Sequence, residues 1–372
     1  MERVVMDLLK TLIIASEKAA NIARLLRENE KLFKKLVEQK SSTEANPRFR
    51  EDFKTLADVL IQEMVKHDVG LKFPEIRDRV YGEENNHFFS VELGKEIVVE
   101  IKETKKETSD LLAALMNDDR EMANLLSDEV HKQVKLEDIN TKQVPHEVTD
   151  GIDVEHLSIW IDPIDGTNEY VKGGYEQNNG QFYRKGLKCV TVLIGVFNTQ
   201  GQPVMGVINQ PFFEAEIDSG FQCHWGVCPN TNNKSSWMSS CDVEVWKETN
   251  NVCLGEKENE AVRQSLKNDG YNLVITRGAG YKLLTVVLGI TDAYILSKGT
   301  TFLWDTCAPH AILLALGGGV IEWVAGTHGQ KNTILYNCRN DGSNCNEKGI
   351  IAYRNEKVLE RLLRLQNGET AK

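Results

Sequence analysis

The residues with the clearest potential for chemistry form the motif Asp162-Pro163-Ile164-Asp165-Gly166-Thr167. It follows the apolar run Leu157–Ile161, a pattern typical of a buried strand that ends in a turn. Because proline restricts both itself and the residue before it, the Asp162 carboxylate and the Ile164 carbonyl have little freedom of direction. Hard divalent cations prefer several oxygen ligands in a rigid cluster. The motif therefore predicts the centre of a metal site.

A second interpretation of the same motif needs no metal. It could be a strand-to-helix turn in which Asp165 or Thr167 caps the helix that continues through Glu169 and Tyr170. Short motifs also occur by chance, so these six residues alone leave both interpretations open.

Asp58 is a further acidic residue near the start of an element. The pattern predicts a helix from about Leu56 to Lys66, and Thr55 stands three residues before Asp58. This spacing also suits a capping pair in which Asp replaces the usual Glu. Spacing alone does not decide between a cap and a ligand-binding role.

Three other acidic residues occur at element ends. Glu83 and Glu84 follow the short extended segment Val80–Gly82, and Asp305 opens the apolar helix Cys307–Leu316. The helix macrodipole favours an acid at such a start in any case, so Asp305 alone is weak evidence for a site.

The elements that must position these residues follow from periodicity. Helical spacing of apolar residues predicts one long helix over about Val4–Val37, broken at Ser41–Pro47. The charge-rich stretch Ile101–Lys135 is helical in pattern and typical of a solvated insertion. Lys188–Phe197 and Pro203–Asn209 predict a hairpin.

The second part of the chain differs in pattern from the first. From about Phe212 onward strands alternate with helices, which is typical of a layered α/β arrangement. Strands are predicted near Val252, Val274, Ala293, Val320 and Ile350, and helices from near Glu256, Tyr281, Thr306 and Asn355.

The composition excludes several classes of protein. A net charge of −11 over 372 residues argues against nonspecific binding to nucleic acid. No run reaches the roughly 20 apolar residues that span a bilayer. Charged residues interrupt the N-terminal apolar segment, unlike a signal peptide: Asp7, Lys10, Glu17 and Lys18. We therefore expect a cytoplasmic protein without nucleic-acid or membrane partners.

The eight cysteines are too few and too irregularly spaced for a disulfide framework. Cys223, His224 and Cys228 could suggest zinc. We favour the alternative, small apolar residues on strands of a reduced protein.

Taken together and in this order, Asp58, Gly82-Glu83-Glu84, the Asp162–Thr167 motif and Trp304-Asp305 resemble a known superfamily. It is the lithium-sensitive, magnesium-dependent phosphomonoesterase superfamily, which includes inositol monophosphatases, bisphosphate nucleotidases and fructose bisphosphatases. The resemblance covers nearly the whole chain and favours the metal site over the helix cap.

Within the superfamily the chain is most similar to the inositol polyphosphate 1-phosphatase family. The segments that carry this likeness are Ser16–Arg24, Asp52–Val59, Gly186–Thr191, Gly278–Lys282 and Trp304–His310. The bisphosphate nucleotidases look similar around Asn209-Gln210-Pro211 but typically carry glutamate where His310 stands.

The resemblance implies an α/β fold, a layered αβαβα sandwich of the sugar-phosphatase type. An α+β half, residues 1–215, would carry most metal ligands. An α/β half, residues 216–372, would carry Asp305 and the residues that determine substrate specificity, with the site in the cleft between the halves.

The resemblance also implies the metal ligands. Glu83, Asp162 and the Ile164 carbonyl would hold one Mg²⁺, and Asp162, Asp165 and Asp305 a second. Asp58 and Glu84 would hold a third, looser ion. Thr167 and Asp58 would polarise the attacking water, and Li⁺ would inhibit by replacing a weakly held Mg²⁺.

The implied activity is hydrolysis of the 1-phosphate of inositol 1,4-bisphosphate and inositol 1,3,4-trisphosphate by a monomer. The implied substrate-binding residues are Thr167, Lys257, Gly278, Lys282 and Thr300. The family usually has serine where Gly255 stands, which removes one expected hydrogen bond. The alternatives are a 3′(2′),5′-bisphosphate nucleotidase and a non-catalytic protein that binds a phosphorylated ligand.

Overall fold

The structure is a computed structural model of the 372-residue chain. It describes residues 2–33, 36–39, 53–90, 94–116, 118–145, 152–178, 180, 182–229, 237–241, 247–323, 331–339 and 342–366. The predicted break at Ser41–Pro47 lies outside the described residues.

The helices are α1 (Glu2–Glu28), α2 (Glu30–Phe33), α3 (Leu56–Lys72), α4 (Lys105–Leu115), α5 (Arg120–His131), α6 (Thr167–Lys172), α7 (Glu260–Asn268), α8 (Ala279–Val287), α9 (Leu303–Ala315) and α10 (Glu356–Gln366). The strands of the first part are β1 (Val37–Gln39), β2 (Phe53–Thr55), β3 (Val80–Gly82), β4 (His87–Ser90), β5 (Lys95–Val98), β6 (Ser158–Asp165), β7 (Tyr175–Asn178), β8 (Phe182–Gly186), β9 (Thr191–Phe197) and β10 (Pro203–Asn209). They are followed by β11 (Cys223–Val227), β12 (Met238–Ser239), β13 (Asn251–Leu254), β14 (Asn272–Ile275), β15 (Ala293–Leu296), β16 (Gly319–Glu322) and β17 (Ile350–Tyr353).

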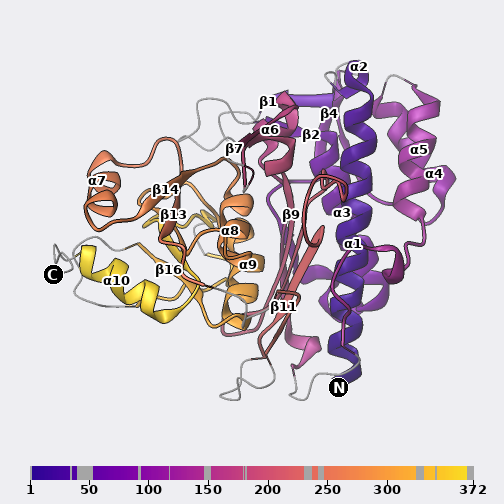
Figure 1. The fold of residues 1–372 in the computed structure, drawn as a ribbon. Coiled ribbons are helices and arrows are strands. Elements are labelled where there is room, and N and C mark those ends of the chain that lie inside the picture. The colour runs from indigo at the N-terminus through magenta and orange to yellow at the C-terminus, as the bar shows by residue number, and fades with distance from the viewer. Residues whose placement is uncertain are drawn as a thin grey trace.

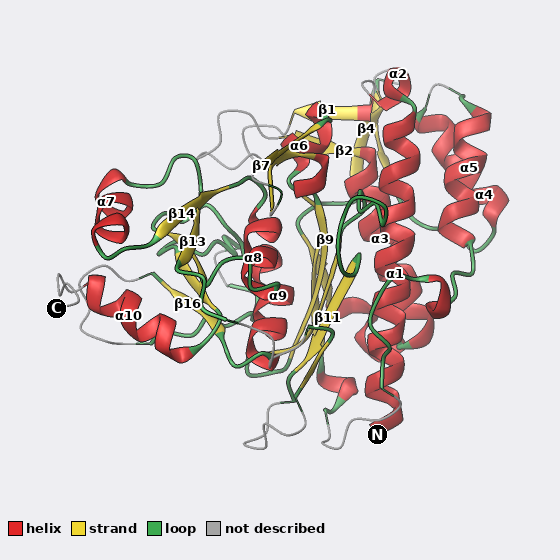
Figure 2. Cartoon of the chain, in the orientation of Figure 1, coloured by secondary structure: helices red, strands yellow, loops and turns green. Residues whose placement is uncertain are grey.

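The layers stack in the order helix, sheet, helix, sheet, helix (Figure 1). α1 and α3 cover one face of a six-stranded sheet, α8 and α9 lie between the two large sheets, and α7 and α10 cover a five-stranded sheet (Figure 2). This arrangement confirms the predicted α/β fold and its αβαβα layering.

The two large sheets differ in strand order and direction. Within the described residues, the first has the order β12-β11-β10-β9-β6-β3 and the second β14-β13-β15-β17-β16. β3 runs parallel to β6, whereas β6, β9, β10 and β11 are antiparallel neighbours. The predicted hairpin of β9 and β10 is confirmed. Among the described residues, the predicted alternation of strands and helices begins at β13 rather than near Phe212, since β11 and β12 follow β10 with no α-helix between them.

The predicted boundary at residue 215 does not coincide with the change of sheet. β11 and β12 follow that position but still pair with the first sheet. The change of sheet therefore lies between Ser239 and Asn251, and the division into two halves stays a prediction.

The hydrophobic core follows the strand period of two. On β6, Ile159 and Ile161 pack toward α1 and α3, whereas Trp160 packs toward α8 and α9. A third apolar cluster lies between the five-stranded sheet and the helices α7 and α10. Because both faces of both sheets are covered, β6, which carries Asp162 and Asp165, is buried from Ile159 to Asp165.

Two sequence expectations for the N-terminal part are corrected. The long helix ends at Glu28 rather than near Val37, since Val37 belongs to β1 and pairs with Thr55 of β2. The last part of the predicted helix is therefore a β-strand, which pairs with β2. α3, in contrast, extends beyond the predicted Lys66 to Lys72, with Val69 buried.

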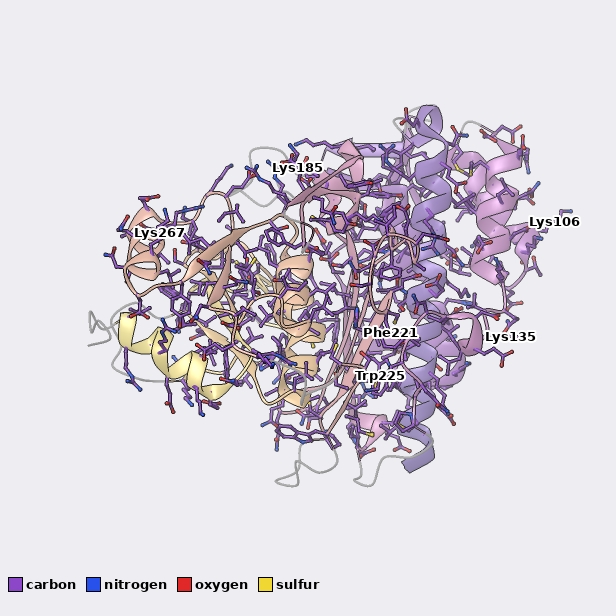
Figure 3. All side chains as sticks on the ribbon, viewed as in Figure 1. Lys106, Lys135, Lys185, Phe221, Trp225 and Lys267 are labelled. Atoms are coloured by element: carbon purple, nitrogen blue, oxygen red, sulfur yellow. The ribbon has the colours of Figure 1, made fainter. Side chains whose placement is uncertain are left out.

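The stretch Ile101–Lys135 is helical as predicted, but it is not simply solvated. α4 and α5 bury apolar residues in the first core cluster, including Leu112 and Leu126. The charges occupy the outer face, where Lys106 and Lys135 project to solvent (Figure 3).

All eight cysteines are free. Cys223 is buried on β11, Cys228 is buried directly after it, and His224 is buried between them. Their burial agrees with the predicted packing role. In the part of the chain that the structure describes, no helix has the length and apolar character needed to cross a membrane.

Candidate metal centre

A β-bulge in β6 brings the carboxylates of Asp162 and Asp165 close together. Asp162 pairs with Leu193 of β9 and Asp165 with Thr191, so β6 has one residue more than its partner between these pairs. On a regular strand, side chains three residues apart point to opposite faces. The extra residue turns both carboxylates to the same side, and Pro163 is tolerated there because a bulge leaves a residue out of the ladder.

The turn after β6 decides the helix-cap interpretation. The N-cap of α6 is Gly166, with φ of 84°, and it makes no side-chain cap. The Thr167 hydroxyl donates to the Ile164 carbonyl at 3.2 Å. The Asp165 carboxylate accepts from the Ala279 N–H at 3.1 Å and from the Thr191 hydroxyl at 3.3 Å. Neither Asp165 nor Thr167 caps α6, so that alternative is wrong.

Asp305 reaches the same place from the first turn of α9. Its Oδ2 accepts the Phe302 N–H at 2.5 Å, which fixes the carboxylate at the helix start. Asp162, Asp165 and Asp305 each offer an oxygen that lies within 4.8 Å of the others. These three residues, the carboxylate cluster, are only 2%, 4% and 7% exposed.

The electrostatics of the carboxylate cluster favour a bound cation. Burial, followed by the charges of Glu83 and the other aspartates, raises the pKa of Asp162 well above its ordinary value. Burial and the charge of Asp165 likewise raise the pKa of Asp305, and burial raises the pKa of Asp165 to about 6. Among the described residues, Asp162 Oδ1 is buried without a hydrogen-bond partner. Buried unpaired oxygens are costly, and a divalent cation would satisfy them.

Glu83 lies near the cluster because β3 runs parallel to β6 and its last residue, Gly82, pairs with Ile161, the residue before Asp162. The Glu83 N–H donates to the Ile161 carbonyl at 3.2 Å, directly beside Asp162. A side chain at Gly82 would collide with Gln62, since its Cβ would lie 1.8 Å from Oε1. Gly82 therefore lets β3 approach α3 closely enough to bring Glu83 to the cluster.

Glu84 is oriented by α3 and β2. Its N–H donates to Gln62 Oε1 at 3.0 Å, and its carboxylate lies 3.9 Å from the buried Lys54 ammonium. Lys54 also donates to the Asn85 side chain and to the His87 carbonyl. The sequence prediction did not include this lysine among the site residues, although it lies in the segment Asp52–Val59 that carries the family likeness.

Asp58 does cap α3, as one of its two interpretations predicts. Its Oδ2 accepts the Thr55 N–H and hydroxyl, both at 2.7 Å. It also lies near α6, since burial and then the charge of Asp58 raise the pKa of Tyr170. The cap thus holds Asp58 at the helix that carries Thr167.

The predicted substrate-binding residues are held to different degrees. Gly278 has φ of 73° and precedes α8, whose N-terminal N–H groups meet Asp165. Lys282 lies close enough to oppose the rise in the pKa of Asp165. Lys257 is exposed on the turn after β13, and Thr300 is half-buried in the loop before α9. We call these four residues the substrate wall.

Arg277 is a link that the sequence reasoning missed. It pairs with Glu169 of α6 at 2.9 Å and with Glu256, next to Lys257, at 2.8 Å. The first of these side-chain pairs reaches across from one large sheet region to the other. Its position directly before Gly278 was the only available signal.

The chain is similar in sequence to known proteins. The profile of the inositol monophosphatase family matches residues 87–368. Inositol polyphosphate 1-phosphatase of Mus musculus is 38% identical over 389 aligned positions, covering 96% of each chain. A 3′(2′),5′-bisphosphate nucleotidase of Dictyostelium discoideum is 31% identical over 58% of this chain and 66% of its own.

The fold itself also has solved counterparts. The extragenic suppressor protein suhB of Bartonella henselae superposes with a TM-score of 0.54 at 14% identity, over 96% of this chain and 97% of its own. That likeness concerns the fold alone. The family profile and the nearly full-length relatives together show that the chain belongs to the inositol monophosphatase family.

Proposed function

We propose that the protein is a magnesium-dependent phosphatase that removes the 1-phosphate from inositol 1,4-bisphosphate and inositol 1,3,4-trisphosphate. Family membership and the 38% identity to an inositol polyphosphate 1-phosphatase over 96% of both chains support this activity. The observation that carries the proposal is the carboxylate cluster, three buried acids with one unpartnered oxygen.

The donor set fits Mg²⁺, which prefers carboxylate and carbonyl oxygens. We assign Glu83, Asp162 and the Ile164 carbonyl to one ion and the carboxylate cluster to a second. Asp58 and Glu84 would hold a third. In support of these sets, the charges of Glu83 and Asp58 act on Asp162 and raise its pKa.

Bound magnesium would lower the pKa of a coordinated water and stabilise charge on the leaving oxygen. The chain's own task is positioning, because charge spreads over the phosphoryl oxygens and electrostatics supply most of the rate. Thr167 and Asp58 would orient the attacking water. The hydrogen bonds to Thr55 and to the Ile164 carbonyl hold these two residues in place.

The substrate wall would bind the inositol ring and its remaining phosphate. Lys282 lies beside the carboxylate cluster, whereas Lys257 is exposed at the rim. We propose that Lys257, Lys282, Gly278 and Thr300 make these contacts. An exposed lysine can follow a phosphate whose position differs between substrates.

The activity is tested by phosphate release from inositol 1,4-bisphosphate and adenosine 3′,5′-bisphosphate, each with and without Mg²⁺. We expect preference for the inositol substrate. Preference for the nucleotide would favour the nucleotidase alternative, which the partial match to a bisphosphate nucleotidase keeps open. No release from either substrate, in a folded protein that binds both, would favour the non-catalytic alternative.

The finer properties are proposed on the same basis. Li⁺ would inhibit by displacing a loosely held Mg²⁺, and the protein would act as a cytoplasmic monomer. Phosphate release against LiCl at several Mg²⁺ concentrations tests the first point. Light scattering of the purified chain and imaging of the tagged protein in cells test the other two.

A further inference from the structure

Three glycines form a row across the six-stranded sheet, under α9. Gly206 of β10 pairs with Gly195 of β9 on one side and with Gly226 of β11 on the other. None of the three has a positive φ. Their backbone conformations therefore suit any residue, and the reason for glycine must be what lies above them.

The backbone of α9 lies directly on this row. An added Cβ would lie 2.1 Å from the Ala308 carbonyl oxygen at Gly206 and 2.5 Å from the Ala308 nitrogen at Gly195. At Gly226 it would lie 2.8 Å from the Ile312 Cα. These are backbone atoms, which cannot rotate aside as a side chain can. Any side chain in the row would lift the helix from the sheet.

The lifted part of the helix would carry Asp305. Ala308 lies one turn after Asp305, whereas Ile312 lies about two turns after it. Before Asp305, Trp304 contacts Trp160 with ring centroids 5.8 Å apart. Trp160 pairs with Gly195 and stands two residues before Asp162 on the same face of β6. The helix is thus seated on the sheet immediately beside the carboxylate cluster.

We propose that Gly206 and Gly195 are positioning residues for the metal centre. By admitting the α9 backbone at Ala308, they set how far Asp305 lies from Asp162 and Asp165. The affinity of the cluster for divalent cations then depends on two residues that touch neither cation nor substrate. The inference rests on the proposed function in one respect, that the cluster binds Mg²⁺.

The test compares Gly206→Ala with Gly226→Ala in the full-length protein. Both variants add one methyl under the same helix, at neighbouring positions of the same row. Isothermal titration calorimetry measures Mg²⁺ affinity, and urea denaturation in EDTA measures the stability of the metal-free protein. Circular dichroism checks that each variant is folded. If Gly206→Ala does not fold, Gly195→Ala takes its place, because it meets the same residue of α9.

We expect both variants to lose stability, but only Gly206→Ala to lose Mg²⁺ affinity, by about tenfold or more, as supporting residues of metal sites do. Gly226→Ala should bind Mg²⁺ within about twofold of wild type, because its contact lies a turn further from Asp305. Equal loss of affinity in both variants, or in neither, would overturn the inference. A wild-type protein that binds no Mg²⁺ would overturn the proposed metal centre as well, so the two failures are distinguishable.

Discussion

The carboxylate cluster is held far more firmly than the substrate wall. All three aspartates are buried, and backbone N–H groups fix Asp165 and Asp305. On the wall, Lys257 is exposed and Thr300 half-buried, on a turn and a loop. The difference indicates that the geometry for chemistry is built into the sheet and helix layers. If the wall determines specificity as proposed, Lys257 and Thr300 are the members that could change without disturbing the cluster.

The largest effect should follow a change within the carboxylate cluster. We expect Asp162→Asn to reduce phosphate release about 10³-fold or more, because it removes charge where the proposed ions stabilise the transition state. The free energy of unfolding of the metal-free Asp162→Asn variant should equal or exceed that of wild type, because the substitution removes a buried carboxyl group that neighbouring acids repel. The exposed Asp78→Asn serves as the control. Near-normal turnover of Asp162→Asn would refute the metal assignment.

The pH dependence of the cluster is the next effect in size. The pKa of Asp165, raised to about 6 from 3.8, means that the metal-free folded state holds a proton that the unfolded state releases. Binding of this proton contributes to the free energy of unfolding of the metal-free protein. The contribution is complete below about pH 4 and is lost as pH rises through 6.

Mg²⁺ must displace that proton, so we expect its apparent affinity to fall about tenfold per pH unit below pH 6 for each proton displaced. Calorimetric titrations from pH 5 to 8, in buffers of different ionisation enthalpy, measure both affinity and proton release. Affinity that does not change across this range would contradict the account of the cluster.

Arg277 should produce a smaller effect because it joins α6 to the turn that carries Lys257 and belongs neither to the carboxylate cluster nor to the substrate wall. Arg277→Gln removes its pairs with Glu169 and Glu256 and should loosen the turn that carries Lys257. We expect KM to rise about threefold to tenfold with kcat nearly unchanged, as for a partly exposed ion pair. Arg120→Gln, which breaks two surface pairs on α5, is the matched control. A fall in kcat alone would place Arg277 with the chemistry instead.

The smallest effect should come from restoring a hydroxyl at Gly255. A Cβ there would have no atom within 4 Å, and its φ is not positive, so serine fits without strain. We expect Gly255→Ser to lower KM for inositol 1,4-bisphosphate about twofold to fivefold, the size of one modest hydrogen bond. Gly255→Ala adds the same Cβ without the hydroxyl and should leave KM unchanged. Equal effects of the two variants would show that the hydroxyl makes no contact.

Sequence patterns predicted individual strands and helices, whereas the αβαβα layering and the segments that meet at the cluster were implied by the family resemblance. The apolar run before Asp162 is a buried strand as predicted, and from Asn251 onward the predicted alternation matches the second sheet and its helices. The predictions of strands and helices were correct because the spacing of apolar residues reflects which side chains are buried. The end of α1 at Glu28 was missed, since the pairing of β1 with β2 depends on residues distant in sequence.

The site required information that local patterns do not contain. A bulge in β6 turns the side chains of Asp162 and Asp165 to the same side of the sheet. The residue types of the motif do not predict that β6 has one residue more than β9 between these positions. Asp58 satisfies its capping pattern and still lies beside α6, so the two interpretations were never exclusive. The sequence analysis did not predict that α4 and α5 bury their inner faces, because the many charged residues on their outer faces dominated the pattern.

The most direct test of the central claim is anomalous diffraction from crystals of the protein soaked in Mn²⁺, used in place of Mg²⁺. The account predicts anomalous peaks between Asp162, Asp165 and Asp305, with a further peak toward Glu83. A well-occupied soak that shows Mn²⁺ only elsewhere, or no peak at these carboxylates, would contradict it.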